Sequence, residues 1–173
     1  DRASAHSMLL IEADSGRVLH QENATQKWYP ASVTKLMTAY VTLKAVKAGK
    51  LSLDTLLTVS PNAVAQAPTK MGFKSGSQIT VDNAIKTIMV KSANDIAVAV
   101  AEAAAGPDYP VAMNASAKAL GMTGTNFTNA NGLHSVKNYT TARDLAVLTR
   151  AIRTEFPQYS SYFGIEAVKY GAT

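Results

Sequence analysis

The sequence predicts a mixed α+β fold in which a large helical block is accompanied by a few strands. Two short apolar runs, residues 8–11 and 18–19, flank an Asp-Ser-Gly turn at 14–16, which is typical of a β-hairpin. From residue 32 to 48, apolar residues recur at helical spacing and form one stripe. Near the end of the chain, residues 163–170 alternate weakly between apolar and polar and indicate one further strand.

The helical block is divided by recognisable helix starts and stops. Thr80 and Thr141 are the expected N-caps of two helices, and Gly121 is the expected stop of another. The expected helices span residues 32–48, 81–90, 95–105, 108–120 and 141–153. The alanine-rich helix at 95–105 is apolar nearly all round and is expected to be buried, whereas residues 60–78 are expected to be irregular.

Composition excludes several classes of protein. With 173 residues, 47% apolar residues and 17% charged residues, the chain is long and apolar enough to bury a core and is not a disordered polyelectrolyte. The absence of cysteine excludes disulfides and zinc fingers, and the three histidines fit no metal spacing. The net charge of +5 comes from scattered lysines and arginines, which argues against nucleic-acid binding.

The first candidate site is the sequence Ser-Val-Thr-Lys at residues 32–35, where the first expected helix begins. Residues three apart on a helix lie close together, so Ser32 and Lys35 share the edge of the buried stripe. A serine hydroxyl needs a base to become a nucleophile, and a desolvated lysine is such a base. The helix N-terminus adds N–H groups suited to a developing oxyanion. In the structural alternative, Ser32 only caps the helix and Lys35 extends into water.

The second candidate site is Ser92-Ala93-Asn94, between two expected helices. Here too there is a structural alternative, because Ser92 and Asp95 form an S-x-x-D capping box for the next helix. The pairing of S-x-x-K with a later S-x-N at a corner between helices favours the catalytic interpretation.

With both motifs in place, the chain resembles the low-molecular-mass penicillin-binding proteins, specifically the D-alanyl-D-alanine carboxypeptidases of serine peptidase type. The resemblance extends over essentially the whole chain. The segments that carry it are 29–38, 91–95, the turn at 14–16, the Asn-Gly-Leu loop at 131–133 and the Thr-Ala-Arg-Asp-Leu run at 141–145.

The resemblance implies a β-lactamase/D,D-peptidase-like fold, an antiparallel sheet flanked by helices. It implies that Ser32 is the acylated nucleophile and Lys35 the base that activates it. Ser92 would relay a proton towards the leaving group, and Asn94 would bind the acyl side chain of the substrate and Lys35.

The same resemblance implies the partners and the location. The substrate would be the D-alanyl-D-alanine end of a peptidoglycan stem peptide, with β-lactam antibiotics as its mimics. No metal, organic cofactor or nucleic acid is implied. The expected location is the periplasm or the outer face of the bacterial cytoplasmic membrane, with any signal peptide already absent.

The third motif of the family, K-T-G, is missing. Lys70-Met71-Gly72 precedes Ser92, and Lys169-Tyr170-Gly171 has tyrosine in place of threonine. We therefore expect residues 1–173 to form an incomplete catalytic domain, with a hairpin at 6–22, a helical block at 30–155 and the start of a strand at 163–171. Such a domain lacks its C-terminal strands, is inactive alone, and is completed by a C-terminal fragment of the same protein that carries K-T-G.

Other functions use the same motifs. A D,D-endopeptidase, a β-lactamase of the same fold and a non-catalytic penicillin-sensing module remain alternatives, as does a helical domain in which both motifs are only caps. Two features weigh against the β-lactamase: S-A-N stands where S-D-N is usual, and Glu166 lacks the E-x-x-L-N context of a deacylating base.

Overall fold

The structure is a computed structural model, and it describes residues 8–11, 18–22, 34–67, 70–91, 93–130 and 138–159. Ser32, Ser92 and the strand expected at 163–171 lie outside these residues, so that strand and the division into hairpin, helical block and final strand stay predictions. For residues 8–11 and 18–22 only the backbone is described.

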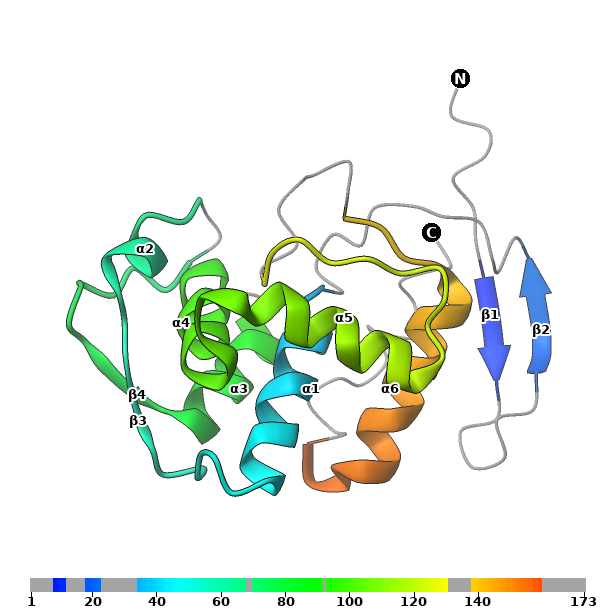
Figure 1. Cartoon of the computed structure of the whole chain (residues 1–173), viewed down its shortest axis with the longest axis horizontal. Helices are drawn as coiled ribbons and strands as arrows, with labels where there is room; N and C mark the ends of the chain where they lie inside the picture. Colours follow the sequence, from blue (N-terminus) through cyan, green and yellow to red (C-terminus); the bar gives the residue numbers. More distant parts are fainter. Residues whose placement is uncertain are drawn as a thin grey trace.

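Helices dominate the described part of the chain, with two small antiparallel strand pairs beside them (Figure 1). The mixed fold class expected from the sequence is confirmed. In chain order the elements are β1 Met8–Ile11, β2 Val18–Glu22, α1 Thr34–Lys47, β3 Leu56–Thr58, α2 Pro61–Val64, β4 Gln78–Thr80, α3 Val81–Lys91, α4 Asn94–Ala105, the 3-10 turn η2 Gly106–Asp108, α5 Tyr109–Leu120, α6 Ala142–Glu155 and the 3-10 turn η3 Pro157–Tyr159.

Helix α1 is the centre of the helical block. It contacts α3, α4, α5 and α6, and these four helices surround it in Figure 1. The sequence predicts a single apolar stripe on this helix, but burial extends well beyond it to the polar residues Thr38 and Thr42. Each of these threonine hydroxyls hydrogen-bonds a carbonyl one helical turn back, Thr42 Oγ1 to Thr38 O at 2.8 Å, for example. Such local bonds let a polar side chain be buried without an unpaired hydroxyl.

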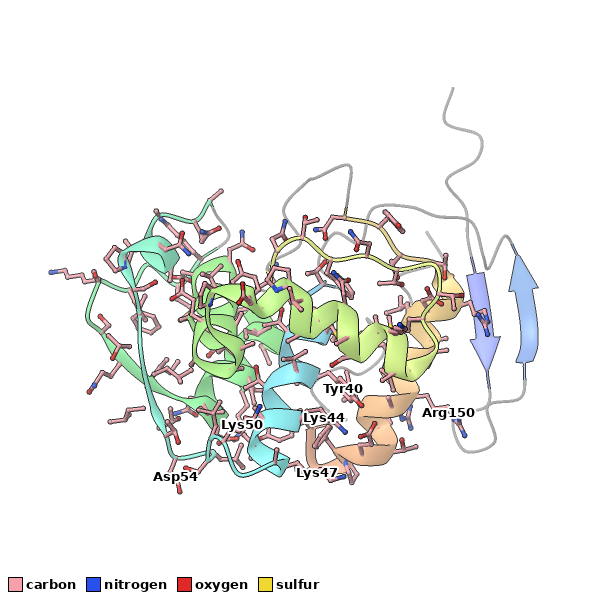
Figure 2. The ribbon with its side chains drawn as sticks, in the orientation of Figure 1. Tyr40, Lys44, Lys47, Lys50, Asp54 and Arg150 are labelled. Atoms are coloured by element: carbon pink, nitrogen blue, oxygen red, sulfur yellow. The ribbon has the colours of Figure 1, made fainter. Side chains whose placement is uncertain are left out.

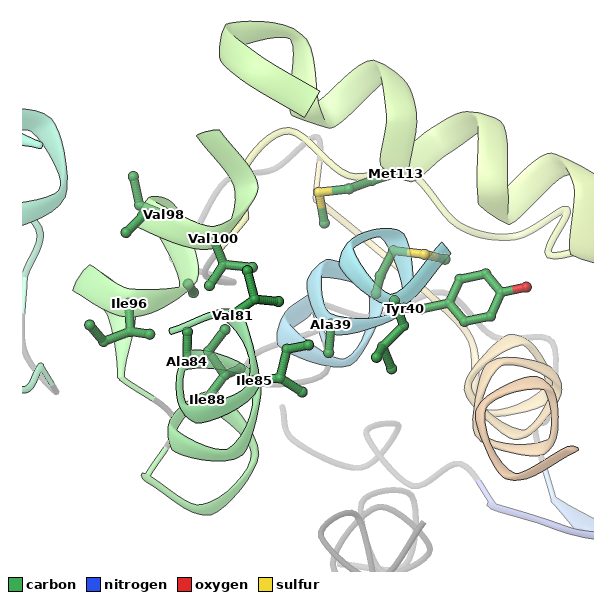
Figure 3. Packing of buried hydrophobic residues seen from close by; sticks show 14 of the residues in the cluster. Ala39, Tyr40, Val81, Ala84, Ile85, Ile88, Ile96, Val98, Val100 and Met113 are labelled. Carbon is green, nitrogen blue, oxygen red and sulfur yellow. The ribbon is translucent and has the colours of Figure 1, made fainter. Parts of the chain in front are cut away.

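The core lies between α1 and the pair α3 and α4. Ile85 and Ile88 of α3 meet Ile96 and Val100 of α4 in one apolar cluster that also includes residues of α1 (Figure 3). Ile96 and Val100 of α4 are fully buried, as expected for an alanine-rich helix that is apolar nearly all round.

A polar contact joins α1 to the far end of α6. The Tyr40 hydroxyl donates a 2.6 Å hydrogen bond to Glu155 Oε2, and Lys44 Nζ lies 3.3 Å from Glu155 Oε1. Figure 2 shows Tyr40 and Lys44 side by side facing α6. Burial, the hydrogen bond to Glu155 and its negative charge together raise the pKa of Tyr40 well above its ordinary value.

The helix boundaries largely follow the predicted caps. The Thr141 hydroxyl accepts a hydrogen bond from the backbone N–H of Asp144 at 3.0 Å, and Thr80 does the same for Asn83 at 3.2 Å. Gly121 ends α5 with a left-handed φ of 81°, which glycine adopts without steric cost. Asp108 precedes α5 but makes no side-chain cap bond, because the 3-10 turn η2 leads directly into the helix.

The segment expected to be irregular contains regular structure, so that expectation is wrong in part. Ser60 caps the short helix α2 by accepting a hydrogen bond from Ala63 N at 3.0 Å. Strands β3 and β4 pair antiparallel, with Leu57 opposite Ile79. Each strand has only three residues, too few for an alternating pattern to stand out in the sequence.

The N-terminal strands form a separate two-stranded sheet. Strands β1 and β2 are antiparallel, with Met8 opposite Glu22 and a register irregularity between Leu10 and Ile11. Strand β1 contacts α6, and Figure 1 shows the pair at the edge of the helical block. Two strands alone are marginal in water, so this pair depends on the helix beside it. In the described part of the chain, no helix is both long and apolar enough to cross a membrane.

The packing predicts that truncating two side chains of α3 has very different effects on the free energy of unfolding. Ile85 is fully buried, whereas Val90 is 66% exposed. Ile85→Ala should lower the free energy of unfolding by about 2–5 kcal/mol, because it leaves a cavity in the core. Val90→Ala should change it by less than about 0.5 kcal/mol. Urea denaturation of both variants checks this, and equal losses would contradict the described packing.

Candidate active site

Lys35 lies in the first turn of α1 and is buried, with only 7% of its surface exposed. It forms no ion pair with any carboxylate in the described part of the chain. Burial without a compensating negative charge disfavours the ammonium form, and it lowers the pKa of Lys35 from its ordinary value of 10.5. The alternative in which Lys35 extends into water is therefore wrong, and a lysine that releases its proton more easily is a candidate general base.

Asn94 begins α4 and is 3% exposed. Its Nδ2 donates a 2.8 Å hydrogen bond to the carbonyl of Ala67. A carbonyl oxygen only accepts, so this bond fixes the orientation of the amide and directs Oδ1 away from Ala67. Oδ1 is buried and has no hydrogen-bond partner among the residues that the structure describes. A buried acceptor without a donor is costly, which is consistent with a site that receives a donor from elsewhere.

The structure places two of the four predicted site residues. Lys35 and Asn94 both lie in the first turn of a helix, and their helices α1 and α4 pack against each other. No hydrogen bond joins the two side chains. The motif serines, Ser32 and Ser92, lie outside the described residues, so their roles stay predictions.

Asp95 is a buried residue of the site region, and in the structural alternative drawn from the sequence it belongs to a helix capping box. Its Oδ1 and Oδ2 each accept a 3.0 Å hydrogen bond from a backbone N–H, those of Met71 and Gly72 respectively. The N-cap position of α4 is occupied by Ala93, which makes no side-chain cap bond. The carboxylate of Asp95 is thus directed to a distant loop.

Two further contacts hold the segment that precedes the Asn-Gly-Leu loop. The Thr38 hydroxyl of α1 donates a 2.7 Å hydrogen bond to the carbonyl of Ala130. The side chain of Asn114 accepts from the N–H of Phe127 at 2.8 Å and donates to its carbonyl at 2.9 Å. The chain entering residues 131–133 is therefore tied to both α1 and α5, although that loop itself lies outside the described residues.

Lys70 does not have the surroundings of a K-T-G lysine. Its Nζ donates a 3.0 Å hydrogen bond to the carbonyl of Val64, and the N–H groups of Met71 and Gly72 are bound to Asp95. The other weak match, residues 169–171, lies outside the described residues. Among the residues that the structure describes, no cluster of three or more His, Cys, Asp or Glu side chains is placed to hold a metal ion.

Comparison with known proteins agrees with this arrangement. The chain is 38% identical to D-alanyl-D-alanine carboxypeptidase DacA of Escherichia coli (strain K12) over an alignment of 167 residues. This alignment covers 91% of the chain. The structure matches the D-alanyl-D-alanine carboxypeptidase DacD of Francisella tularensis with a TM-score of 0.88 and 34% identity over 94% of this chain. It also matches Penicillin-Binding Protein D2 of Listeria monocytogenes in its ampicillin-bound form, with a TM-score of 0.74 and 30% identity over 89% of this chain and 63% of that one.

These matches identify the fold as that of the penicillin-binding D,D-peptidases. Residues 1–170 match the family described as D-alanyl-D-alanine carboxypeptidase, peptidase family S11, and the chain belongs to this family. The resemblance inferred from the sequence motifs is thereby confirmed. The chain spans 41% of the length of DacA and 40% of that of DacD.

The burial of Lys35 predicts a pH-dependent stability. Because its pKa is lowered on folding, the folded chain binds fewer protons than the unfolded chain between the lowered pKa and 10.5. Stability therefore rises with pH through that window, and the buried charge destabilises the fold most at pH values below it. Lys35→Met should raise the Tm near neutral pH, and this gain should shrink as the pH approaches 10.5.

Lys47 is the matched control, because it lies exposed at the other end of the same helix (Figure 2). Thermal denaturation of Lys35→Met and Lys47→Met across this pH range measures the difference. If the gain in Tm from Lys35→Met were the same at both ends of this pH range, the charge of Lys35 would not be what destabilises the fold.

Proposed function

We propose that this chain forms the N-terminal part of a serine-type D-alanyl-D-alanine carboxypeptidase, which removes the terminal D-alanine of peptidoglycan stem peptides through an acyl-enzyme. The observation that carries the proposal is the burial of Lys35, three residues after Ser32, at the start of the central helix. Family membership supports the substrate class, because the matching family and relatives are named for this activity.

The chemistry divides between the two motifs. Neutral Lys35 takes the proton of the Ser32 hydroxyl, and the serine oxygen attacks the carbonyl carbon of the penultimate D-alanine. The N–H of Ser32 contributes to stabilising the resulting oxyanion. When the peptide bond breaks, Ser92 relays a proton to the amine of the departing D-alanine. Water then attacks the acyl-enzyme, which releases the shortened peptide and restores the Ser32 hydroxyl.

Asn94 binds the reacting groups from the other helix. Because its Nδ2 holds the Ala67 carbonyl, its free Oδ1 is the atom that accepts a hydrogen bond. The donors available in the proposed site are the amine of Lys35 and the amide N–H of the substrate's acyl portion. A hydrogen bond from the Lys35 amine to Oδ1 of Asn94 would remove the cost of leaving this buried acceptor unpaired, and it would also orient the lysine as a base.

β-Lactams would acylate the same serine, since a relative that matches 89% of this chain has been solved in an ampicillin-bound form. The proposed substrate is a component of the bacterial cell wall, which supports a location in the periplasm or on the outer face of the cytoplasmic membrane.

A C-terminal part of the same protein would complete the site. The lysine of K-T-G, which would bind the terminal carboxylate of the substrate, has no convincing match in the chain. In the described residues, the sheet beside α6 has only strands β1 and β2. A following strand that carries K-T-G would extend this sheet and add the second oxyanion N–H.

Ser32→Ala should abolish the covalent adduct that labelled penicillin forms with the full-length protein, because no other residue of the proposed site is the nucleophile. Mass spectrometry of the tryptic peptides should locate the wild-type adduct on Ser32. Ser52→Ala, at an exposed serine bonded to Thr55, is the control and should label normally. An adduct on another serine would refute the assignment, and a labelled protein that fails to turn over D-alanyl-D-alanine peptide would be a sensor and not an enzyme.

Residues 1–173 expressed alone should be acylated far more slowly than the full-length protein, because the carboxylate-binding lysine and one oxyanion donor are missing. Stopped-flow measurement of penicillin acylation, together with the oligomeric state of the fragment, checks this. A soluble, monomeric fragment that reacts at the full-length rate would refute the need for a further segment and make Lys169 the candidate for the third motif.

A further inference from the structure

Asp95 makes an unusual set of contacts for a carboxylate in the first turn of a helix. It is fully buried, and its two oxygens accept hydrogen bonds from three backbone N–H groups, those of Met71, Gly72 and Ile96. Two of the three donors lie more than 20 residues earlier in the chain. The carboxylate therefore attaches a loop to the start of α4. Hydrogen bonds from backbone N–H groups to a carboxylate are charge-assisted and are among the stronger hydrogen bonds in proteins.

The described residues of this loop, 67 and 70–72, are called the strap; the two residues between them lie outside the described part of the chain. Asp95 binds the strap at Met71 and Gly72, and the neighbouring Asn94 binds its other end through the Ala67 carbonyl at 2.8 Å. Two consecutive residues of α4 thus hold both ends of the strap. The strap in turn holds the amide of Asn94, whose orientation decides whether an acceptor or a donor faces the proposed site.

We propose that Asp95 is a positioning residue for the acylation of Ser32, acting through the strap and Asn94. By fixing Met71 and Gly72, Asp95 keeps the Ala67 carbonyl in place, and that carbonyl keeps Nδ2 of Asn94 turned away so that Oδ1 is presented. Without the carboxylate, the strap is released at one end and the Asn94 amide loses its fixed partner. This inference rests on the proposed function, because it assigns Asp95 a part in that reaction.

Asp95→Asn tests the proposal with little change of shape. An amide cannot accept from both strap N–H groups, since its Nδ2 is itself a donor. The rate of acylation by labelled penicillin should fall about ten- to hundredfold in the full-length protein, the range expected when a reacting group is misplaced. The final labelling should still reach one adduct per molecule, because the folded enzyme reacts slowly but completely. Loss of folded protein would instead reduce the final labelling and leave the rate unchanged.

Asp144 provides the matched control. It is 1% exposed in the first turn of α6, and its Oδ2 accepts hydrogen bonds from Gly124 N at 2.8 Å and Thr125 Oγ1 at 2.7 Å. Asp144→Asn removes a comparable buried carboxylate that has no bond to the strap, so it should lower the Tm similarly while acylation stays within about threefold of wild type. Equal loss of acylation in both variants would overturn the proposal, because it would show a general effect of stability.

A double-mutant cycle tests the route through Asn94. If Asp95 acts by orienting Asn94, then Asp95→Asn should add little further loss of rate to Asn94→Ala. Losses that add in full would overturn the proposed route.

Amide hydrogen exchange measures how firmly the strap is held and does not depend on acylation. In Asp95→Asn the N–H of Met71 or that of Gly72, whichever faces the new Nδ2, should exchange at least about tenfold faster, because it loses its acceptor. Unchanged exchange would overturn the role of Asp95 in holding the strap. If the wild-type protein were not acylated at all, the proposed function would fail and the positioning role with it, while the exchange result would still decide whether Asp95 holds the strap.

Discussion

The enclosure of α1 by four helices is the constraint on which the rest of the structure depends. It places a lysine in a dry environment at one end of the helix and leaves other lysines in water at the opposite end. A lysine at the end of a surface helix would keep its proton and its hydration, and it would serve no base chemistry. Here the amine is buried, and it lies three residues from the motif serine.

Around this core, single buried polar side chains hold the loops. Asp95 holds the strap, Asp144 holds residues 124–125, and Asn114 binds both backbone groups of Phe127. Each of these side chains belongs to a helix and bonds backbone groups of a distant loop. Gly124 shows how closely one such loop approaches its helix, since a Cβ there would lie 2.7 Å from Thr141 Cγ2. The helices thus give the rigid frame, and a few buried acceptors and donors fix the loops that border the site.

Local chemistry explains what the sequence predicted well. Caps such as Thr141 and stops such as Gly121 act within a few residues, and the burial of α4 follows from its alanine-rich composition. Pairing over longer distances was missed: β3 and β4 are three-residue strands some 20 residues apart. From the sequence, Asp95 is considered only as half of a capping box in the structural alternative, because its observed partners include distant backbone N–H groups, which every non-proline residue has and no sequence pattern marks.

The contact between Tyr40 and Glu155 has a consequence for the time course of folding during synthesis. These residues are separated by 115 positions, and Thr38 and Ala130 by 92, so the central helix meets its last neighbour only after nearly the whole helical block has been made. Contacts at such sequence separation slow folding, because a long loop must close before they form. The nascent chain therefore carries a hydrated, charged Lys35 until the helical block has been made, and the burial of this lysine is complete only once that block has assembled.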